Sequence, residues 1–278
     1  DGRPILGLDA RRLLAMVVED CPRALFIPAH VWTPHFSVLG SASGFDSLEE
    51  CFEELTPHVH AFETGLSSDP PMNWRVPALN NLTLVSNSDA HSPQKVGREA
   101  NIFQADLSFD AMARAISTRE GFEGTIEFFP EQGKYHYDGH RPCKVRLTPR
   151  ESADAGYRCP VCGKKVTLGV LNRVEALAGR EAGFHPLNAR PFISLIPLKD
   201  IIADTLHAGT QTKKVDGLYF ELLEKLGPEL AILMDVPLAE ITRADHPDIA
   251  EAIARVRAGD VTIEPGYDGE YGRVTIRR

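Results

Sequence analysis

The chain has 278 residues, of which 43% are hydrophobic and 25% are charged. This balance is typical of a globular protein and excludes a disordered chain. No apolar run approaches the ~20 residues that span a bilayer, and no leader-like segment opens the chain, so we expect a cytoplasmic protein without membrane association. Five cysteines, two of them in a Cys-x-x-Cys pair, favour metal-bound thiols over disulfides.

Charge is distributed unevenly along the chain. Residues 1–133 carry nine basic and nineteen acidic side chains, whereas residues 134–165 carry eight basic and three acidic side chains. The acidic block suits a cation site or a solvated surface, and the basic block suits contact with phosphates. The net charge of −9 argues against a non-specific nucleic-acid coat but allows a small basic footprint.

The first 128 residues alternate between helical and strand patterns. Helices are predicted over 8–18, from 46 onward and over 108–116, with Asp9, Asp46 and Ser108 as their respective caps. Short apolar runs predict strands over 24–27, 59–62, 82–85 and 124–128. This order predicts an α/β fold with a mainly parallel sheet or barrel.

The remaining sequence divides into two parts. Residues 129–168 are interrupted by glycine and proline and contain three cysteines, which predicts a small separate module. Residues 169–278 are mostly helical, with helices expected over 170–178, 199–206, 214–226 and 247–258 and a terminal hairpin over 262–276. We therefore predict three domains, over 1–128, 129–168 and 169–278.

Polar side chains follow three successive predicted strands in the first block. His30 follows the first strand, Glu63 the second, and Asp89 with His91 the third. The carboxyl ends of parallel strands line one crevice, and imidazole and carboxylate groups bind the metals of hydrolases. Each residue alone also fits a structural histidine, a cap or an ion pair, but together they indicate a metal site whose bound hydroxide attacks a phosphate ester.

A second metal site is predicted in the basic block. Cys159-x-x-Cys162 forms one chelating pair, and His140-x-x-Cys143 is expected to form the other, which together give the layout of a closed structural zinc site. His136 competes for the fourth position. A segment so rich in glycine and proline needs a metal to hold it together.

Basic residues in and beyond this module are candidates for contact with the DNA backbone. Such contacts position a duplex without reading its sequence. Two lysines follow a glycine-led loop before a predicted helix, where an ordinary helix cap is the alternative explanation. The predicted set is Lys134, Arg141, Lys144, Arg146, Lys164, Lys165, Lys213 and Lys214.

Several sequence strings resemble a known superfamily. Pro28-Ala29-His30 with Ser88-Asp89-Ala90-His91 resembles the later metal motifs of the PHP (polymerase and histidinol phosphatase) superfamily, whose members are distorted β/α barrels with multinuclear metal sites. The strings over 27–34, 63–74, 86–93, 97–101 and 133–141 resemble one branch, endonuclease Q.

The resemblance implies a function. It implies a metal-dependent DNA-repair endonuclease, a hydrolase that cuts the strand on the 5′ side of deaminated bases, such as uracil and hypoxanthine, or of abasic sites. It carries over His30, Asp89 and His91 as catalytic ligands of Zn²⁺, Mn²⁺ or Mg²⁺, in addition to the structural Zn²⁺. The expected partner is DNA that contains damaged bases.

The loop over residues 63–74 is a candidate for reading the damaged base. A deaminated base is inspected outside the helix, in a closed pocket that bonds to its Watson–Crick edge. A structural loop with a Pro70-Pro71 corner is the alternative. The candidate substrate-binding residues are Glu63, Gly65, Leu66, Ser67, Ser68 and Trp74.

The sequence departs from the PHP pattern in one large respect. PHP enzymes begin with an H-x-H strand, and no such motif precedes His30 here. We therefore expect a partial PHP-type distorted β/α barrel, followed by a zinc-ribbon-like module and a helical C-terminal domain. We further expect that an N-terminal segment completes the barrel and that the isolated chain is inactive. The rival predictions are a PHP phosphoesterase or exonuclease that acts on another phosphate ester, and a non-catalytic DNA-binding accessory protein.

Overall fold

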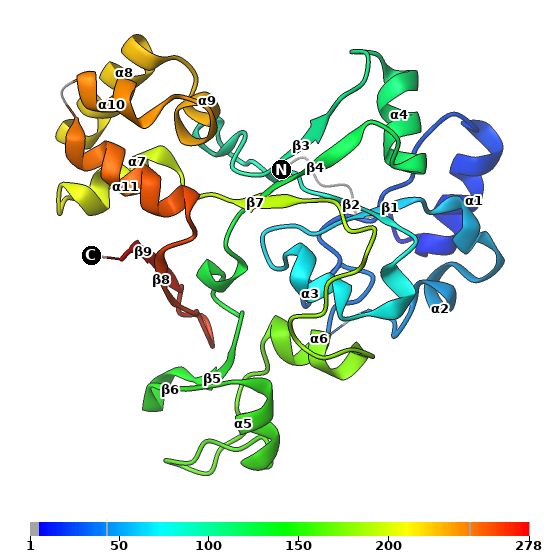
Figure 1. The fold of residues 1–278 in the computed structure, drawn as a ribbon. Coiled ribbons are helices and arrows are strands. Elements are labelled where there is room, and N and C mark those ends of the chain that lie inside the picture. Colours follow the sequence, from blue (N-terminus) through cyan, green and yellow to red (C-terminus); the bar gives the residue numbers. More distant parts are fainter. Residues whose placement is uncertain (1–5, 43, 245, 278) are drawn as a thin grey trace.

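The structure is a computed structural model that describes residues 6–42, 44–244 and 246–277. It contains two lobes and a protruding unit (Figure 1). The first lobe holds α1 (Ala10–Asp20), α2 (Leu48–Phe52), β1 (Ala61–Glu63), α3 (Pro70–Trp74), β2 (Thr83–Val85), β3 (Ala100–Phe103), α4 (Phe109–Thr118), β4 (Phe122–Glu127), α6 (Val170–Leu177) and β7 (Phe192–Ser194).

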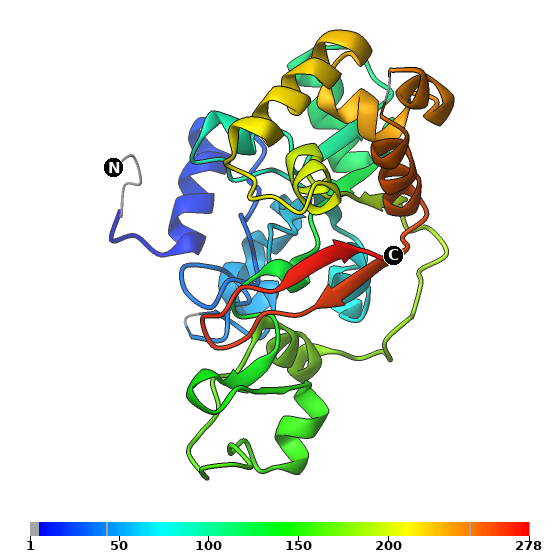
Figure 2. The ribbon, with the colours of Figure 1, turned by 90° about the vertical axis from the view of Figure 1, so that its left-hand side faces the viewer.

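The second lobe and the protruding unit follow β4 in the chain. The protruding unit holds β5 (Asp138–His140), β6 (Val145–Leu147) and α5 (Pro149–Asp154), and we call residues 138–168 the Cys/His unit. The second lobe holds α7 (Leu198–Thr205), α8 (Lys213–Leu226), α9 (Glu229–Met234), α10 (Leu238–Arg243) and α11 (Pro247–Arg257). The hairpin of β8 (Val261–Glu264) and β9 (Arg273–Ile276) lies between this lobe and the Cys/His unit (Figure 2).

The strands pair in small sheets. β1 and β2 are parallel, and β4 pairs with β7 in parallel and with β3 antiparallel. The sequence predicts a mainly parallel arrangement for residues 1–128, and within this part the antiparallel β3 is the exception. The hairpins β5–β6 and β8–β9 are antiparallel. The α/β class is confirmed, whereas the partial-barrel description stays a prediction.

Local sequence determines most helix starts. Asp9 and Ser108 cap α1 and α4 as predicted, because each side chain accepts a hydrogen bond from a backbone N–H of the first turn. The prediction that Asp46 caps α2 is wrong, because the cap is the next residue, Ser47. The Asp46 side chain pairs instead with Arg173 at 2.8 Å.

The strand predicted over 24–27 is not formed as a regular strand. The segment after it still runs beside β1, because Glu63 N–H donates to Pro28 O at 2.9 Å and Val31 N–H donates to Glu63 O at 3.3 Å. These two bonds place His30, which lies between Pro28 and Val31, next to the end of β1.

The cores join segments on both sides of the Cys/His unit. Val170 and Val174 of α6 are buried with Trp32 and Phe62 of the first lobe. β7 extends the β3–β4 sheet, with Phe192 opposite Thr125. The elements α6 and β7, which sequence reasoning placed in the C-terminal domain or left unassigned, therefore pack with the first lobe. The Cys/His unit is inserted between β4 and these elements.

A second core holds the helical lobe together. Ile201, Leu222, Ile241 and Ile253 are fully buried there and pack with Ile126 of β4. The predicted helices and terminal hairpin of this part are confirmed, and α9 and α10 are additional. None of the helices in the described ranges combines the length and the hydropathy that a bilayer-spanning helix requires.

Candidate functional site

Glu63 connects the ends of the two parallel strands. It is the last residue of β1 and is only 8% exposed. Its Oε2 accepts a hydrogen bond from the backbone N–H of His30 at 2.8 Å, and its Oε1 accepts one from the Asn87 side-chain amide at 2.9 Å. The carboxylate therefore holds the His30 loop and the loop after β2 side by side. The sequence predicts that Glu63 binds substrate, and this role stays a prediction. In the structure each of its carboxylate oxygens accepts a hydrogen bond within the protein.

His30 is held in a strained backbone position. Its φ angle is +33°, and its ring Nδ1 lies 3.1 Å from the Thr33 hydroxyl. A hydroxyl partner at Nδ1 orients the ring so that Nε2 can bind a cation. Gly65 makes room for this residue, since a Cβ atom on Gly65 would come within 2.7 Å of the His30 Cβ. A close approach and a φ of +62° both favour glycine at position 65.

Asp89 and His91 lie in the loop after β2. Asp89 also has a positive φ, +42°, and the His91 Nδ1 lies 2.8 Å from the Asp89 carbonyl oxygen. A proton on Nδ1 leaves the ring lone pair on Nε2, which is the arrangement of a metal-binding histidine. The Arg98 side chain donates to Ser88 O at 2.9 Å and so fixes the start of this loop.

The three candidate metal ligands do not form a closed cluster. Ligands of one zinc ion at ~2.0–2.2 Å lie close to one another. The described residues contain one group of three or more potential ligands whose atoms all lie within 4.8 Å, and that group is in the Cys/His unit. His30, Asp89 and His91 are brought to neighbouring strand ends, and their donor chemistry suits a divalent cation, but they do not enclose one by themselves. Their metal-binding role stays a prediction.

The predicted base-reading loop begins directly after β1. Ser68 is fully buried, and its hydroxyl donates to Thr64 O at 2.8 Å and accepts from Asn73 Nδ2 at 3.1 Å. These bonds use the hydroxyl to hold the loop. The buried Ser67 Oγ, in contrast, has no hydrogen-bond partner among the described residues. The substrate-contacting role of Gly65, Leu66 and Ser67 stays a prediction.

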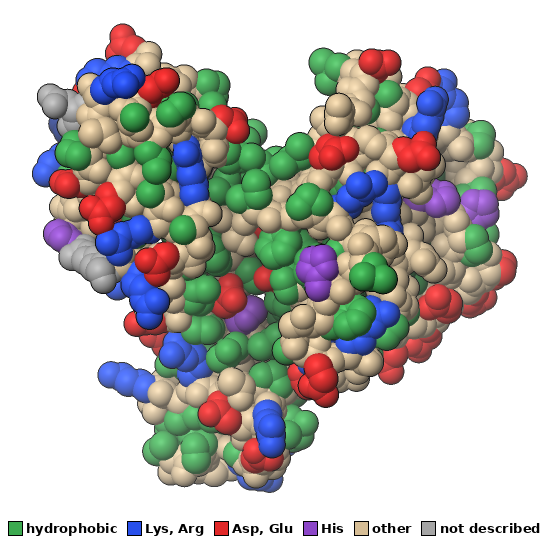
Figure 3. All heavy atoms as spheres, in the orientation of Figure 1, with side chains coloured by type: hydrophobic (Ala, Val, Ile, Leu, Met, Phe, Trp, Pro, Cys, Tyr) green, Lys and Arg blue, Asp and Glu red, His purple; other side chains and the backbone are tan. Residues whose placement is uncertain are grey.

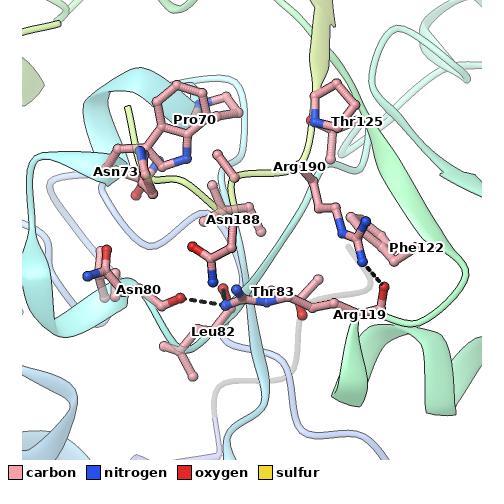
Figure 4. Close-up of a pocket in the computed structure, with 16 residues that line it drawn as sticks. Pro70, Asn73, Asn80, Leu82, Thr83, Arg119, Phe122, Thr125, Asn188 and Arg190 are labelled. Carbon is pink, nitrogen blue, oxygen red and sulfur yellow. Dashed lines mark hydrogen bonds between the residues drawn. The ribbon is translucent and has the colours of Figure 1, made fainter. Parts of the chain in front are cut away.

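Trp74 ends this loop, as the last residue of α3. Its indole packs edge-on against His185 and Phe192, with ring centroids 4.5 and 5.8 Å apart. It lines a pocket at the start of β2, together with Thr83 and the side chains of Arg119 and Arg190 (Figure 4). The loop with Asp89 follows the other end of β2, so the structure does not bring Trp74 together with the candidate metal ligands.

Two buried carboxyl groups near the site were missed by sequence reasoning. Burial raises the pKa of Glu99 to about 9, assisted by the nearby Glu127, and burial raises the pKa of Glu127 to about 7. Glu127 Oε2 accepts from the Thr64 hydroxyl at 3.0 Å, and Glu99 Oε2 has no hydrogen-bond partner in the described part of the chain. Only their position in the fold distinguishes these residues from solvated acids, because no spacing in the sequence reveals burial.

The Cys/His unit brings the second predicted ligand set together. The ligand atoms of His140, Cys143, Cys159 and Cys162 all lie within 4.8 Å of one another. The β5–β6 hairpin supplies the first pair, and the turn after α5 supplies the second. Burial alone would raise the pKa of Cys159, but backbone N–H groups of Cys162 and Val161 lower it to about 7. The pKa of Cys143 is raised to about 11, chiefly by its hydrogen bond to Cys162, so the stabilised thiolate that suits a structural metal is that of Cys159.

His136 is not part of this cluster. It is 5% exposed, and its ring stacks on Tyr137 with centroids 5.4 Å apart. Burial lowers its pKa to about 4, so the ring is neutral at physiological pH. The alternative that sequence analysis left open for the fourth ligand is therefore resolved in favour of His140.

The predicted DNA-backbone residues are all exposed, but they lie on two surfaces. Six belong to the Cys/His unit or its entry, whereas Lys213 and Lys214 begin α8 in the helical lobe. The Thr212 side chain caps that helix by accepting from Val215 N–H at 3.4 Å, which is the ordinary cap. Figure 3 shows a hollow between this lobe and α4, with hydrophobic side chains along its floor.

The chain matches known families and structures. A model of the PHP-associated family matches residues 74–120, and a model of the MJ0043 C-terminal domain matches residues 197–260. The uncharacterized protein MJ0043 of Methanocaldococcus jannaschii is 34% identical over 254 residues, which cover 88% of this chain and 31% of that protein. The uncharacterized protein YqxK of Bacillus subtilis is 31% identical over 255 residues, which cover 90% of this chain and 60% of that protein.

Two crystal structures are similar over the whole chain. The novel lesion-specific endonuclease PfuEndoQ from Pyrococcus furiosus has a TM-score of 0.89 and 32% identity, and the match covers 100% of this chain and 68% of that chain. Endonuclease Q in complex with a 27-mer duplex substrate with an abasic lesion at the active site has a TM-score of 0.85 and 31% identity, and the match covers 100% of this chain and 69% of that chain.

These matches define an α/β protein with a PHP-associated region. The chain belongs to the endonuclease Q family. It spans about a third of MJ0043 and 60% of YqxK.

Proposed function

We propose that the chain is part of a metal-dependent DNA-repair endonuclease that cuts on the 5′ side of deaminated bases or abasic sites. The observation that carries this proposal is the Glu63 carboxylate, which fixes the His30 loop beside the loop of Asp89 and His91. It does so at the carboxyl ends of parallel strands, where α/β enzymes bind their substrates. The family relationship to a lesion-specific endonuclease supports the same function.

The metal chemistry is assigned to three residues of the site. His30 and His91, each through Nε2, and the Asp89 carboxylate would hold one or more divalent cations, Zn²⁺, Mn²⁺ or Mg²⁺. Such a cation activates water and stabilises negative charge on a phosphate. The three residues do not close around an ion, so we propose that further protein ligands are required for activity.

The rest of the chain would bind and orient DNA. The backbone of Gly65 and Leu66 and the buried Ser67 hydroxyl would contact the edge of the damaged base. The exposed cations of the Cys/His unit and Lys213 with Lys214 would contact phosphates, so binding should weaken steeply with salt. The Cys/His cluster would hold a structural Zn²⁺, which would fix the fold of the Cys/His unit and so the positions of its lysine and arginine side chains.

One observation favours a non-catalytic DNA-binding accessory instead. The candidate catalytic ligands do not form a closed set, whereas the Cys/His cluster does. A phosphoesterase for small esters is less well supported, because eight exposed cations on two surfaces exceed what a small substrate needs.

One experiment separates the three functions. The chain is assayed alone and joined to the N-terminal barrel segment that the PHP pattern predicts, with Mg²⁺ or Mn²⁺. The substrates are a uracil-containing duplex, a normal duplex and a phosphate monoester. We expect a nick only 5′ to the uracil, and only from the extended chain. Hydrolysis of the monoester supports the phosphoesterase, and DNA binding without cleavage in both forms supports the accessory.

A further inference from the structure

The loop that follows His30 is built as a rigid projection. Val31 and Trp32 at its base are fully buried, and the Trp32 indole donates to Asn73 Oδ1 at 2.7 Å. The backbone N–H of Leu39 donates to Val31 O at 2.9 Å and closes the loop. Residues 33–38 are therefore held on a fixed base in the first lobe.

One hydroxyl connects the tip of this loop to the candidate metal site. Thr33 Oγ1 lies 3.1 Å from His30 Nδ1 and 3.3 Å from the carbonyl oxygen of His35. The Ser37 hydroxyl in turn donates to Thr33 O at 2.5 Å. The Thr33 hydroxyl therefore links the tip of the loop to the His30 ring.

The tip presents an aromatic side chain in a costly conformation. Phe36 is 83% exposed, although burial of a phenyl ring is strongly favourable. Its φ of +59° lies in the left-handed region, which is an outlier for a bulky residue. Its ring and that of His35 lie 6.4 Å apart at a tilt of 51°. Backbone strain of this kind is concentrated at residues that bind a ligand or take part in catalysis.

We propose that the Phe36 ring stacks on a nucleobase that becomes exposed beside the lesion when DNA is bound. This inference rests on the proposed function, since it needs a damaged nucleotide at the His30 end of the lobe. A base taken out of the helix leaves a neighbouring π-face without its stacking partner, and an exposed phenyl ring on a rigid loop can replace it. The tip carries no cation of its own, so recognition is through ring stacking rather than phosphate contact.

The test measures equilibrium binding to a duplex that carries 2-aminopurine next to an abasic site, without added divalent cation. Stacking by one aromatic side chain corresponds to about 5- to 150-fold in affinity. We expect Phe36→Ala and Phe36→Gly to weaken binding within that range, and Phe36→Trp to restore it and to lose indole fluorescence on binding. The matched control is Phe220→Ala, which removes a 62%-exposed phenyl ring from α8 and should leave binding unchanged.

Stability measurements separate stacking from a structural role. Glycine relieves the positive φ at position 36, so Phe36→Gly should unfold at a temperature no lower than the unsubstituted chain while its DNA binding is weakened. Unchanged DNA binding by Phe36→Ala would overturn the proposal, as would equal losses for Phe36→Ala and Phe36→Trp. If the chain binds DNA through Phe36 but the chain extended by the N-terminal barrel segment never nicks DNA with Mg²⁺ or Mn²⁺, the stacking inference stands and the endonuclease function fails. A chain that binds no DNA contradicts both.

Discussion

Gly65 lies directly against His30, so that a Cβ atom on Gly65 would come within 2.7 Å of the His30 Cβ. Gly65→Ala should therefore displace the His30 loop and destabilise the fold by about 1–3 kcal/mol. We expect thermal unfolding of the chain at a lower temperature, and, in the chain extended by the N-terminal barrel segment, a loss of lesion-dependent cleavage of about tenfold or more. Gly183→Ala is the matched control, because Gly183 also has a positive φ but nothing within 4 Å of its added Cβ. Equal effects of the two substitutions would show that contact with His30 is unimportant.

The Glu63 carboxylate should couple His30 to Asn87. Hydrogen bonds to a charged group contribute about 1.5–3 kcal/mol, and Glu63→Gln removes the charge and one acceptor. We expect Glu63→Gln and Asn87→Ala each to lower the stability of the chain and the metal-dependent cleavage by the chain extended with the N-terminal barrel segment. The double variant should lose less free energy of unfolding than the sum of the losses of the two single variants. We expect a coupling free energy of about 0.5–3 kcal/mol in a double-mutant cycle measured by chemical denaturation. Strict additivity would mean that the two loops are positioned independently.

Buried acids should make stability depend on pH. Glu99 and Glu127 have folded-state pKa values of about 9 and about 7, above their ordinary value of 4.5. The folded state therefore favours their protonated forms, and their contribution to stability is complete below pH 4.5 and is lost as pH rises through 7 and 9. Glu99→Gln should reduce the fall in unfolding temperature between pH 6 and pH 9. The exposed Glu123→Gln should not, and a fall of the same size in both variants would contradict the assignment.

Metal removal should unfold one part of the molecule. Cys143→Ser, or a chelator, takes a ligand or the ion from the Cys/His cluster, and a segment with so little core depends on that ion. Hydrogen exchange in residues 138–168 should rise sharply, while the core around Trp32 and Phe62 stays protected. Cys21→Ser is the control, since Cys21 is exposed and outside the cluster. Bound zinc that survives in Cys143→Ser would argue against this ligand set.

Local sequence signals predicted much of this structure. The caps at Asp9 and Ser108 and the terminal hairpin depend on residues near one another in the chain, so their patterns are readable. The two chelating pairs of the Cys/His cluster are likewise encoded by short spacings, and the structure confirms that they converge.

Features that depend on contacts between segments far apart in the sequence could not be predicted from local patterns. β4 and β7 meet through Thr125 and Phe192, which the intervening Cys/His unit separates in sequence. The role of Glu63 depends on the neighbours that the fold gives it, and the raised pKa of Glu99 depends on burial. The direction of the Trp74 side chain also depends on distant neighbours, because α3 carries the indole toward His185 and Phe192.

The central claim is that His30, Asp89 and His91 serve one divalent-cation site. Calorimetric titration with Mn²⁺ of the chain loaded with one equivalent of Zn²⁺ tests it most directly, because we expect the Cys/His cluster to take up that single zinc ion. We expect the unsubstituted chain to bind Mn²⁺ and the variants His30→Ala, Asp89→Asn and His91→Ala each to lose about tenfold or more in affinity. The exposed Glu123→Gln should bind as before. Mn²⁺ affinity that is the same in all four variants and the unsubstituted chain would contradict the account.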